Sequence, residues 1–105
     1  LAGNGMLFIS GQIPVNPETG KVPETITEQT EQVFKNIEAI LTEAGYSFKD
    51  VVKTTCLLNS MDDFAAINEV YAKYYNEMLP ARAAYAVEKL PMGVLVEIET
   101  IAYKG

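Results

Sequence analysis

The 105-residue sequence has no histidine, no tryptophan, one cysteine and one arginine. Without histidine, the chain lacks the usual general base at neutral pH and the commonest metal ligand. Cys56 has no second cysteine as a partner, which excludes a disulfide within the chain. No run of apolar residues approaches the ~20 that a membrane-spanning helix needs. Catalysis by this chain would depend on carboxylate, Arg, Lys, Tyr, Ser or Thr side chains, and we expect no metal ion.

Positive charge is scarce as well. The chain carries 14 acidic and 8 basic side chains, a net charge of −6 at pH 7. Since nucleic acids and anionic membranes are bound through a surplus of Lys and Arg, this balance disfavours both as partners. The length and the 49% hydrophobic content suit one folded domain over residues 1–105. With no signal peptide in view, we expect a cytoplasmic protein, and we expect an N-terminal segment before Leu1 to be missing from this sequence.

Hydrophobic periodicity predicts strands that alternate with helices. Thr25 and Glu28 match a capping box at the start of the first helix, and Gly45 is suited to end it. Residues 90–93 are typical of a short loop between the last two strands, which predicts that these strands pair as a hairpin. The expected strands cover residues 6–10, 51–58, 81–89 and 94–103, and the expected helices cover residues 25–44 and 64–78.

One face of the expected sheet has no cover within the chain. Two amphipathic helices cover only one face of a four- or five-stranded sheet, which predicts an α+β domain. Along residues 51–58, alternation assigns Val52 and Cys56 to one face and Val51 and Leu57 to the other. The apolar side chains that would then face water are Val51, Leu57, Ala84 and Leu95. Because a large uncovered apolar face usually marks an interaction surface, we expect a homo-oligomer.

Arg82, the only arginine, is the first candidate for a binding residue. Its planar guanidinium can hold a carboxylate through two parallel hydrogen bonds, which a lysine ammonium cannot do. The small residues Ala81, Ala83 and Ala84 around it leave room for a ligand. From position alone, the commoner interpretation is an exposed arginine in a weak surface ion pair.

Glu97 and Glu99 are candidates for acid/base chemistry. They alternate with Val96 and Ile98, so both carboxylates project from the same face of a largely apolar strand. Carboxylates on such a strand are costly unless they are paired or functional. If the last two strands form a hairpin, Arg82 lies across from these acids, and a cross-strand ion pair explains them equally well.

Three other features have plainer explanations. Cys56 lies in a strand pattern of a chain without histidine, which favours a buried, inert thiol. Tyr71, Tyr74 and Tyr75 are explained by packing of the second helix rather than by a stacking platform. Asn68 is polar among apolar neighbours, as an ordinary exposed helix position would be.

Taken together, these segments resemble the RidA/YjgF family of enamine/imine deaminases across essentially the whole chain. The matching segments are Ser10-Gly11-Gln12-Ile13-Pro14, Asn16-Pro17 with Gly20, Val51-Val52-Lys53-Thr54-Thr55, Asp63-Phe64 with Asn68 and Tyr71, Pro80-Ala81-Arg82, Leu90-Pro91 and Val96-Glu97-Ile98-Glu99. No single segment is decisive, but their order and spacing together are specific.

The resemblance implies a fold like that of the bacterial AroH-type chorismate mutase, a homotrimer with mainly antiparallel sheets around a three-fold axis and helices outside. It implies ligand clefts between subunits. It also implies hydrolysis of 2-enamino and 2-imino acids, such as 2-aminoacrylate and 2-iminobutyrate, to 2-keto acids and ammonia, without a cofactor. Arg82 matches the family's carboxylate-binding arginine, and Glu97 matches the acid that positions or activates water. Ser10, Gly11 and Asn68 match residues in or near the cleft.

Two departures from the family pattern bear on the site. Many members have a cysteine where this chain has Ala84. Ala84 suffices as a binding residue if only its backbone contacts the ligand, and a mechanism through that thiol is excluded. The family also has a Gly-Pro-Tyr segment upstream of the first strand, whose tyrosine lines the site, and no such segment precedes Leu1 in this sequence.

Two other functions stay open. The same arginine and cleft would serve a trimer that binds small 2-keto acids without converting them. Some relatives have been described as endoribonucleases or translation inhibitors, although a net charge of −6 argues against RNA as a substrate.

Overall fold

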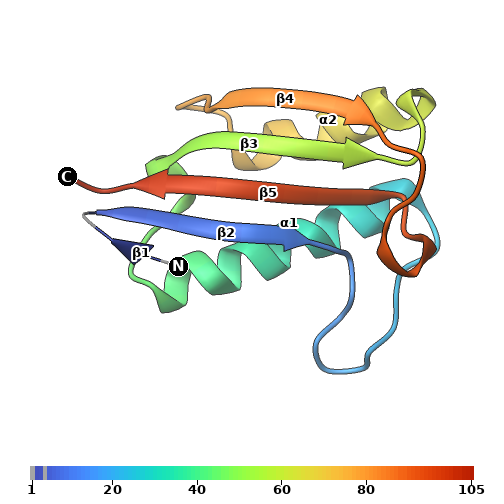
Figure 1. Cartoon of the computed structure of the whole chain (residues 1–105), viewed down its shortest axis with the longest axis horizontal. Helices are drawn as coiled ribbons and strands as arrows, with labels where there is room; N and C mark the ends of the chain where they lie inside the picture. Colours follow the sequence, from blue (N-terminus) through green and yellow to red (C-terminus); the bar gives the residue numbers. More distant parts are fainter. Residues whose placement is uncertain (1, 4) are drawn as a thin grey trace.

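The computed structural model describes residues 2–3 and 5–105, with side chains from residue 5 onward, as one sheet with two helices behind it (Figure 1). The strands are β1 (Ala2–Gly3), β2 (Met6–Gln12), β3 (Val51–Leu58), β4 (Ala81–Ala86) and β5 (Val96–Tyr103), and the helices are α1 (Ile26–Glu43) and α2 (Phe64–Tyr74). Short 3-10 helices cover Phe48–Asp50, Met61–Asp63 and Pro91–Gly93. The expected α+β class is confirmed, with both helices on one face of a mixed sheet.

The strand order is β1-β2-β5-β3-β4, so β5 lies inside the sheet between β2 and β3. β5 pairs antiparallel with both neighbours, whereas β3 and β4 are parallel. α2 connects β3 to β4 as a crossover, which returns the chain to the same end of the sheet. The predicted hairpin is therefore wrong, because β3 lies between β4 and β5. Residues 87–95 instead pass the end of β3, where Val87 N–H donates to the Leu58 carbonyl and Asn59 N–H donates to the Leu95 carbonyl.

α1 begins and ends where its capping residues predict. The Thr25 hydroxyl accepts from the Glu28 N–H at 3.1 Å and donates to the Glu28 carboxylate at 3.0 Å. Gly45 follows the helix with a φ of 82°, a left-handed conformation that glycine adopts without strain. The inner side of α1, including Phe34 and Leu41, packs on the sheet as the main part of the core. Within the described residues, neither helix is long and apolar enough to cross a membrane.

α2 ends at Tyr74, one turn earlier than predicted. Tyr75 leaves the helical conformation, with φ −119° and ψ 73°, and buries its ring. That ring packs against Phe34 and Phe48, with centroid distances of 5.9 and 5.5 Å. Tyr71 and Tyr74 also pack on Phe34, so the predicted role of the three tyrosines in helix packing is confirmed. Aromatic packing, rather than helical periodicity, decides where α2 ends.

The face of the sheet away from α1 and α2, here called the open face, is uncovered in the single chain (Figure 1). Phe8 and Tyr103 are large side chains on this face and are 46% and 48% exposed. Leu57, which the alternation assigned to this face, is half-buried, as is Leu95. The uncovered apolar face expected from the sequence is present in the isolated chain.

The alternation prediction is wrong at three positions. The β3–β5 register shifts between Val51 and Lys53, which marks a bulge. Because a bulge adds one unpaired residue, the alternation reverses across it. Val51 is therefore buried and Val52 is 44% exposed, the opposite of the prediction. Ala84 also lies on the helix-covered face, where it packs against the core beside its register partner Cys56.

Candidate active site

Arg82 lies on the edge strand β4 and contacts α2 on the helix-covered face. Its Nη1 donates to Asn68 Oδ1 at 2.6 Å. Its guanidinium carbon lies 4.6 Å from the centre of the Tyr71 ring and 5.2 Å from the centre of the Phe64 ring. Residues 64, 68 and 71 share one face of α2 because they are four and three positions apart. In the sequence, this four- and three-residue spacing is what identifies the α2 residues that surround Arg82.

Arg82 has no carboxylate partner among the described residues. The ion pairs found there join other side chains. The cross-strand pair with Glu97 or Glu99 does not form, because β3 separates β4 from β5. The hydrogen-bond partner of Arg82 is the neutral amide of Asn68. A guanidinium has five N–H donors, so Arg82 keeps donors and an uncompensated charge for an anionic ligand.

A hollow of about 500 Å³ opens beside this guanidinium. Its polar wall is formed by Asn68 and Arg82. The other lining residues are Tyr71, Ala72, Tyr75, Leu79 and Pro80. A charged group beside an apolar wall suits a small organic acid with an apolar side chain. Ala84, the third predicted site residue on this side, packs against the core and does not line the hollow.

Gly11 and Glu97 meet on the open face, where β2 runs beside β5. The Glu97 carboxylate lies so close over the Gly11 backbone that a Cβ at position 11 would overlap Oε2. Any larger residue at position 11 would therefore displace the Glu97 carboxylate from this place. The flanking residues Val96 and Ile98 are buried under the helices, which leaves Glu97 half-buried on the opposite face.

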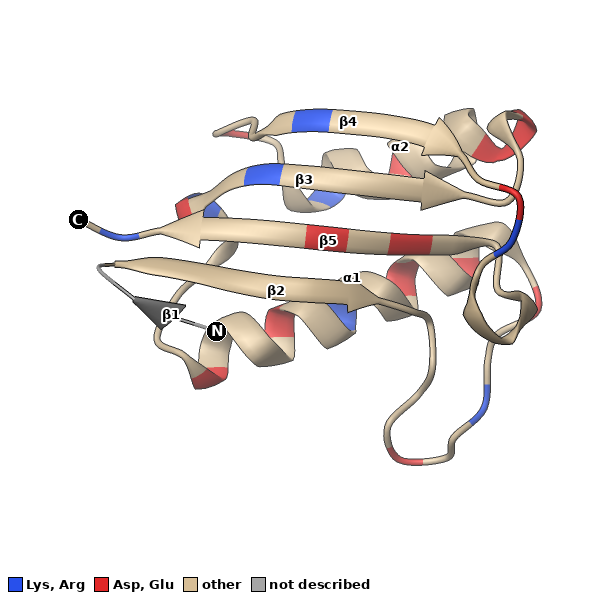
Figure 2. Cartoon of the chain, in the orientation of Figure 1, with Lys and Arg blue, Asp and Glu red and all other residues tan. Residues whose placement is uncertain are grey.

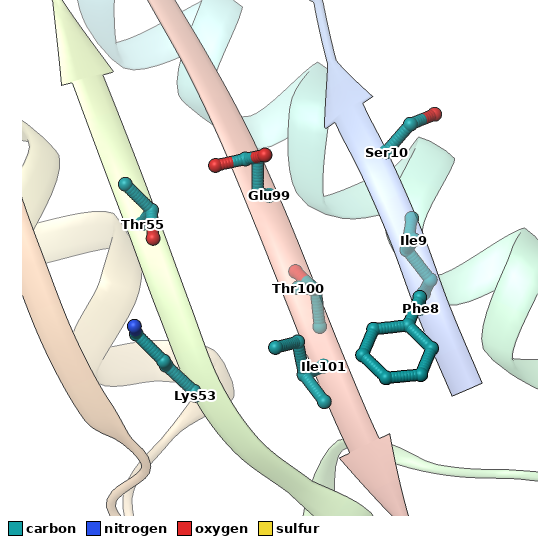
Figure 3. A pocket seen from close by; sticks show the side chains of 8 residues that line it. All are labelled: Phe8, Ile9, Ser10, Lys53, Thr55, Glu99, Thr100 and Ile101. Carbon is teal, nitrogen blue, oxygen red and sulfur yellow. The ribbon is translucent and has the colours of Figure 1, made fainter. Parts of the chain in front are cut away.

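Ser10 lines another hollow on the open face, of about 440 Å³ (Figure 3). Figure 3 shows Glu99 of β5 lying between Thr55 of β3 and Ser10 of β2. The other residues that line this hollow are Phe8, Ile9, Lys53, Thr100 and Ile101. Ser10 therefore shares the open face with Gly11 and Glu97 rather than the face of Arg82, although the carboxylate that lines its hollow is Glu99.

The predicted site residues thus form two groups on opposite faces of the sheet. Arg82 and Asn68 lie on the helix-covered face, and Ser10, Gly11 and Glu97 lie on the open face. Figure 2 shows the acidic positions of β5 in the middle of the sheet and the basic position of β4 at its edge. Within a single chain, the predicted acid does not reach the predicted carboxylate-binding arginine. Residue spacing alone gave no signal for this separation, because it follows from the strand order.

Cys56 lies on β3 beside the arginine strand and is fully buried. Burial raises the pKa of its thiol to about 11, an effect that the nearby Arg82 charge partly opposes. The thiol is therefore neutral at physiological pH and does not compensate the guanidinium charge. The prediction of a buried cysteine is confirmed.

Comparison with known proteins shows the family of this chain. The sequence matches the family described as Endoribonuclease L-PSP over residues 1–104. A RutC family protein of Pyrococcus horikoshii is 57% identical over 98% of this chain and 82% of its own length. The Mus musculus protein named 2-iminobutanoate/2-iminopropanoate deaminase is 49% identical over 94% of this chain and 74% of its own length.

Solved structures share the whole fold. The E. coli YjgF gene product matches with a TM-score of 0.96 and 40% identity, covering 100% of this chain and 85% of that chain. E. coli TdcF with bound serine matches with a TM-score of 0.96 and 39% identity over the same shares. Fold and site therefore define a small α+β domain of the YjgF type. The chain belongs to the Endoribonuclease L-PSP family, also known as the RidA/YjgF family.

Proposed function

We propose that this protein hydrolyses 2-imino acids and their 2-enamino tautomers, such as 2-iminobutyrate and 2-aminoacrylate, to 2-keto acids and ammonia. The observation that carries the proposal is the Arg82 guanidinium, which borders a hollow and has no carboxylate partner among the described residues. The Mus musculus and Rattus norvegicus relatives named for this deaminase activity are 49% and 47% identical to the chain, which supports the same substrate class here.

Arg82 holds the substrate carboxylate through two parallel hydrogen bonds. Asn68 orients the guanidinium through its bond to Nη1. The imine carbon is directly bonded to the carboxylate, so fixing the carboxylate also fixes the carbon that reacts. Orientation of this kind accounts for a large part of many enzymatic rate enhancements.

Glu97 is the general base and acid of the proposed reaction, and Ser10 and Gly11 border the water beside it. An enamine first takes a proton from solvent at its β-carbon and becomes the iminium. Glu97 then accepts a proton from water as the water oxygen bonds to the iminium carbon, and the C=N π electrons return to nitrogen to give the carbinolamine. Glu97 delivers its proton to that nitrogen, and the C–N bond breaks as the hydroxyl oxygen forms the C=O bond and releases its proton to solvent. One water is consumed, a 2-keto acid and ammonia are released, and no electrons are gained or lost.

The proposed site needs two copies of the chain, because Arg82 and Glu97 lie on opposite faces of the sheet. We propose a homotrimer of the chorismate-mutase type, whose open faces pack around the three-fold axis. In it, the Arg82 side of one copy meets the Gly11–Glu97 side of the next copy. Such a head-to-tail contact closes into a ring and repeats in every cleft. The exposed Phe8 and Tyr103 side chains support this assembly, because it would remove them from water.

A coupled assay tests the activity. A pyridoxal-phosphate-dependent serine or threonine dehydratase generates 2-aminoacrylate or 2-iminobutyrate, which water converts slowly to the keto acid. We expect the purified protein to accelerate the appearance of pyruvate or 2-ketobutyrate above this spontaneous rate. An unchanged rate of keto-acid release with an active dehydratase would exclude the deaminase.

A binding protein for small carboxylates is the second candidate, favoured by the E. coli TdcF structure with bound serine. The same guanidinium would hold a carboxylate without any reaction. Calorimetric binding of serine or 2-ketobutyrate, combined with no acceleration of keto-acid release, would favour this candidate.

Ribonuclease activity is suggested by the family description alone. A chain without histidine and with a net charge of −6 has few groups for binding or cleaving RNA. We expect no RNA binding even at low salt, where electrostatic binding is strongest.

A further inference from the structure

Tyr71 contacts Arg82 but takes no part in the chemistry proposed above. Its ring centre lies 4.6 Å from the guanidinium carbon, within the range in which a cation is attracted to an aromatic face. The Phe64 ring lies 5.2 Å away. The only arginine of the chain is thus in contact with two aromatic rings of α2.

The sheet fixes the hydroxyl end of Tyr71. The Tyr71 and Thr54 hydroxyls share a buried hydrogen bond of 2.8 Å. Thr54 is the register partner of Arg82 in the β3–β4 pairing. Thr54 therefore lies next to Arg82 in the sheet and also holds the Tyr71 ring, against which the Arg82 guanidinium lies.

Core packing fixes the other edges of the Tyr71 ring. Its centroid lies 5.9 Å from that of Phe34 and 4.6 Å from that of Tyr75, and the residue is only 8% exposed. Arg82, in contrast, is exposed, and one hydrogen bond, to Asn68, does not by itself fix the guanidinium plane. A fixed ring face limits the tilt of that plane without using any of its N–H donors.

We propose that Tyr71 is a positioning residue: its ring, anchored by Thr54, holds the guanidinium plane of Arg82 in the orientation that receives a substrate carboxylate. An arginine that is ordered before binding loses less conformational entropy when the ligand arrives. The role in substrate binding rests on the proposed function, but the orientation of Arg82 can be measured without any substrate.

Nuclear magnetic resonance tests the orientation directly. Because Arg82 is the only arginine, its Nε–Hε group gives one unambiguous signal in a ¹H–¹⁵N spectrum. Ring currents shift a proton over an aromatic face upfield. We expect the full shift in the native protein and a smaller shift in Tyr71→Phe, which keeps the ring and loses its bond to Thr54. The shift should be smallest in Tyr71→Leu, where the Phe64 ring remains. Phe34→Leu is the matched control, since it alters the same aromatic cluster and Phe34 has no contact with Arg82 of the kind that Tyr71 makes. It should keep the upfield shift.

Thr54→Val supplies a second variant in case Tyr71→Leu does not fold. It keeps the ring and removes its hydrogen bond, so the Hε shift should become smaller than in the native protein. An Hε shift that is unchanged in Tyr71→Leu, or unchanged in Thr54→Val when Tyr71→Leu is unfolded, overturns the proposal.

Kinetics separate positioning from a merely structural role. Tyr71→Leu should raise KM about tenfold with a smaller change in kcat, and Tyr71→Phe should raise KM by less, to the same extent as Thr54→Val, because both variants lose the same hydrogen bond. An equal rise of KM in Tyr71→Leu and Phe34→Leu would contradict the positioning role. If the native protein itself shows no turnover, the proposed function fails, while the comparison of Hε shifts still decides whether Tyr71 orients Arg82.

Discussion

The two faces of the sheet hold their candidate site residues in different ways. On the helix-covered face, Arg82 is held by Asn68 and by the face of the Tyr71 ring, and the neighbouring Cys56 thiol is neutral. On the open face, Glu97 lies over Gly11 with its sheet neighbours uncovered. One chain thus surrounds Arg82 with its own side chains and leaves the face that carries Glu97 uncovered. The comparison teaches that the surroundings of Arg82 are a property of the fold, whereas those of Glu97 would be completed only in the proposed trimer.

The largest effect is expected from Arg82→Lys, which keeps the positive charge on β4 and replaces the planar guanidinium by an ammonium. We expect kcat/KM in the dehydratase-coupled assay to fall about 1,000-fold, because an ammonium cannot hold a carboxylate by two parallel hydrogen bonds. Lys49→Arg is the matched control, since Lys49 pairs with Glu77 on the surface and should give native rates. Full activity of Arg82→Lys would exclude the bidentate carboxylate contact.

Glu97→Gln tests the proposed acid/base residue on the open face. We expect kcat to fall about 100-fold with little change in KM, since the amide cannot accept the proton of the attacking water. Glu99→Gln removes the next carboxylate on the same face of β5 and should cost much less activity. Equal losses in the two variants would show that Glu97 has no special role.

Gly11→Ala should have a smaller effect through the same carboxylate. The added Cβ would overlap Glu97 Oε2, so the carboxylate must move from its position. We expect kcat to fall about tenfold with KM almost unchanged, and the Gly11→Ala/Glu97→Gln double variant to be no slower than Glu97→Gln alone. Additive losses in the double variant would mean that Gly11 acts by another route.

The smallest effect concerns the pH dependence of stability on the helix-covered face. Burial raises the pKa of Cys56 from 9.0 to about 11 and that of Tyr74 from 10.0 to about 12, so the folded state binds these protons more tightly than the unfolded state. This contribution is complete below pH 9 and is lost as the pH rises through the folded-state values. Urea denaturation should give a free energy of unfolding about 1 kcal/mol lower at pH 10 than at pH 8.

Cys56→Ala provides the control for this pH effect. Without the thiol, the decrease between pH 8 and pH 10 should become clearly smaller. A decrease of the same size in Cys56→Ala would assign it to other groups.

Local chemistry made much of the fold predictable. The capping box at Thr25 and the apolar periodicity that follows predicted α1, and the bounds of β3 were predicted as residues 51–58 although its alternation is broken at Val52. The strand order was not predictable in this way, because residues 87–95 fit a hairpin loop as well as a passage over the end of β3. The early end of α2 and the bulge at Val51 also depend on tertiary contacts, which periodicity does not contain.

The candidate site residues could be named from the sequence, but their arrangement could not be predicted. Asn68 was named through the family resemblance, and its spacing from Phe64 and Tyr71 is what places all three on one face of α2. The choice of Arg82 and Glu97 rested on their residue types and on the family resemblance. Their placement on opposite faces follows from the insertion of β3 between β4 and β5, a long-range feature that no local pattern encodes.

Complementation between two inactive variants tests most directly whether the site is divided between two copies of the chain. Arg82→Ala and Glu97→Gln would be co-expressed and the mixed oligomers purified, each variant alone being nearly inactive. In randomly mixed trimers, about one quarter of the clefts receive the native arginine from one copy and the native glutamate from the next. We expect about a quarter of native activity in this mixture. Mixed trimers that stay as inactive as the separate variants would contradict a site divided between two copies.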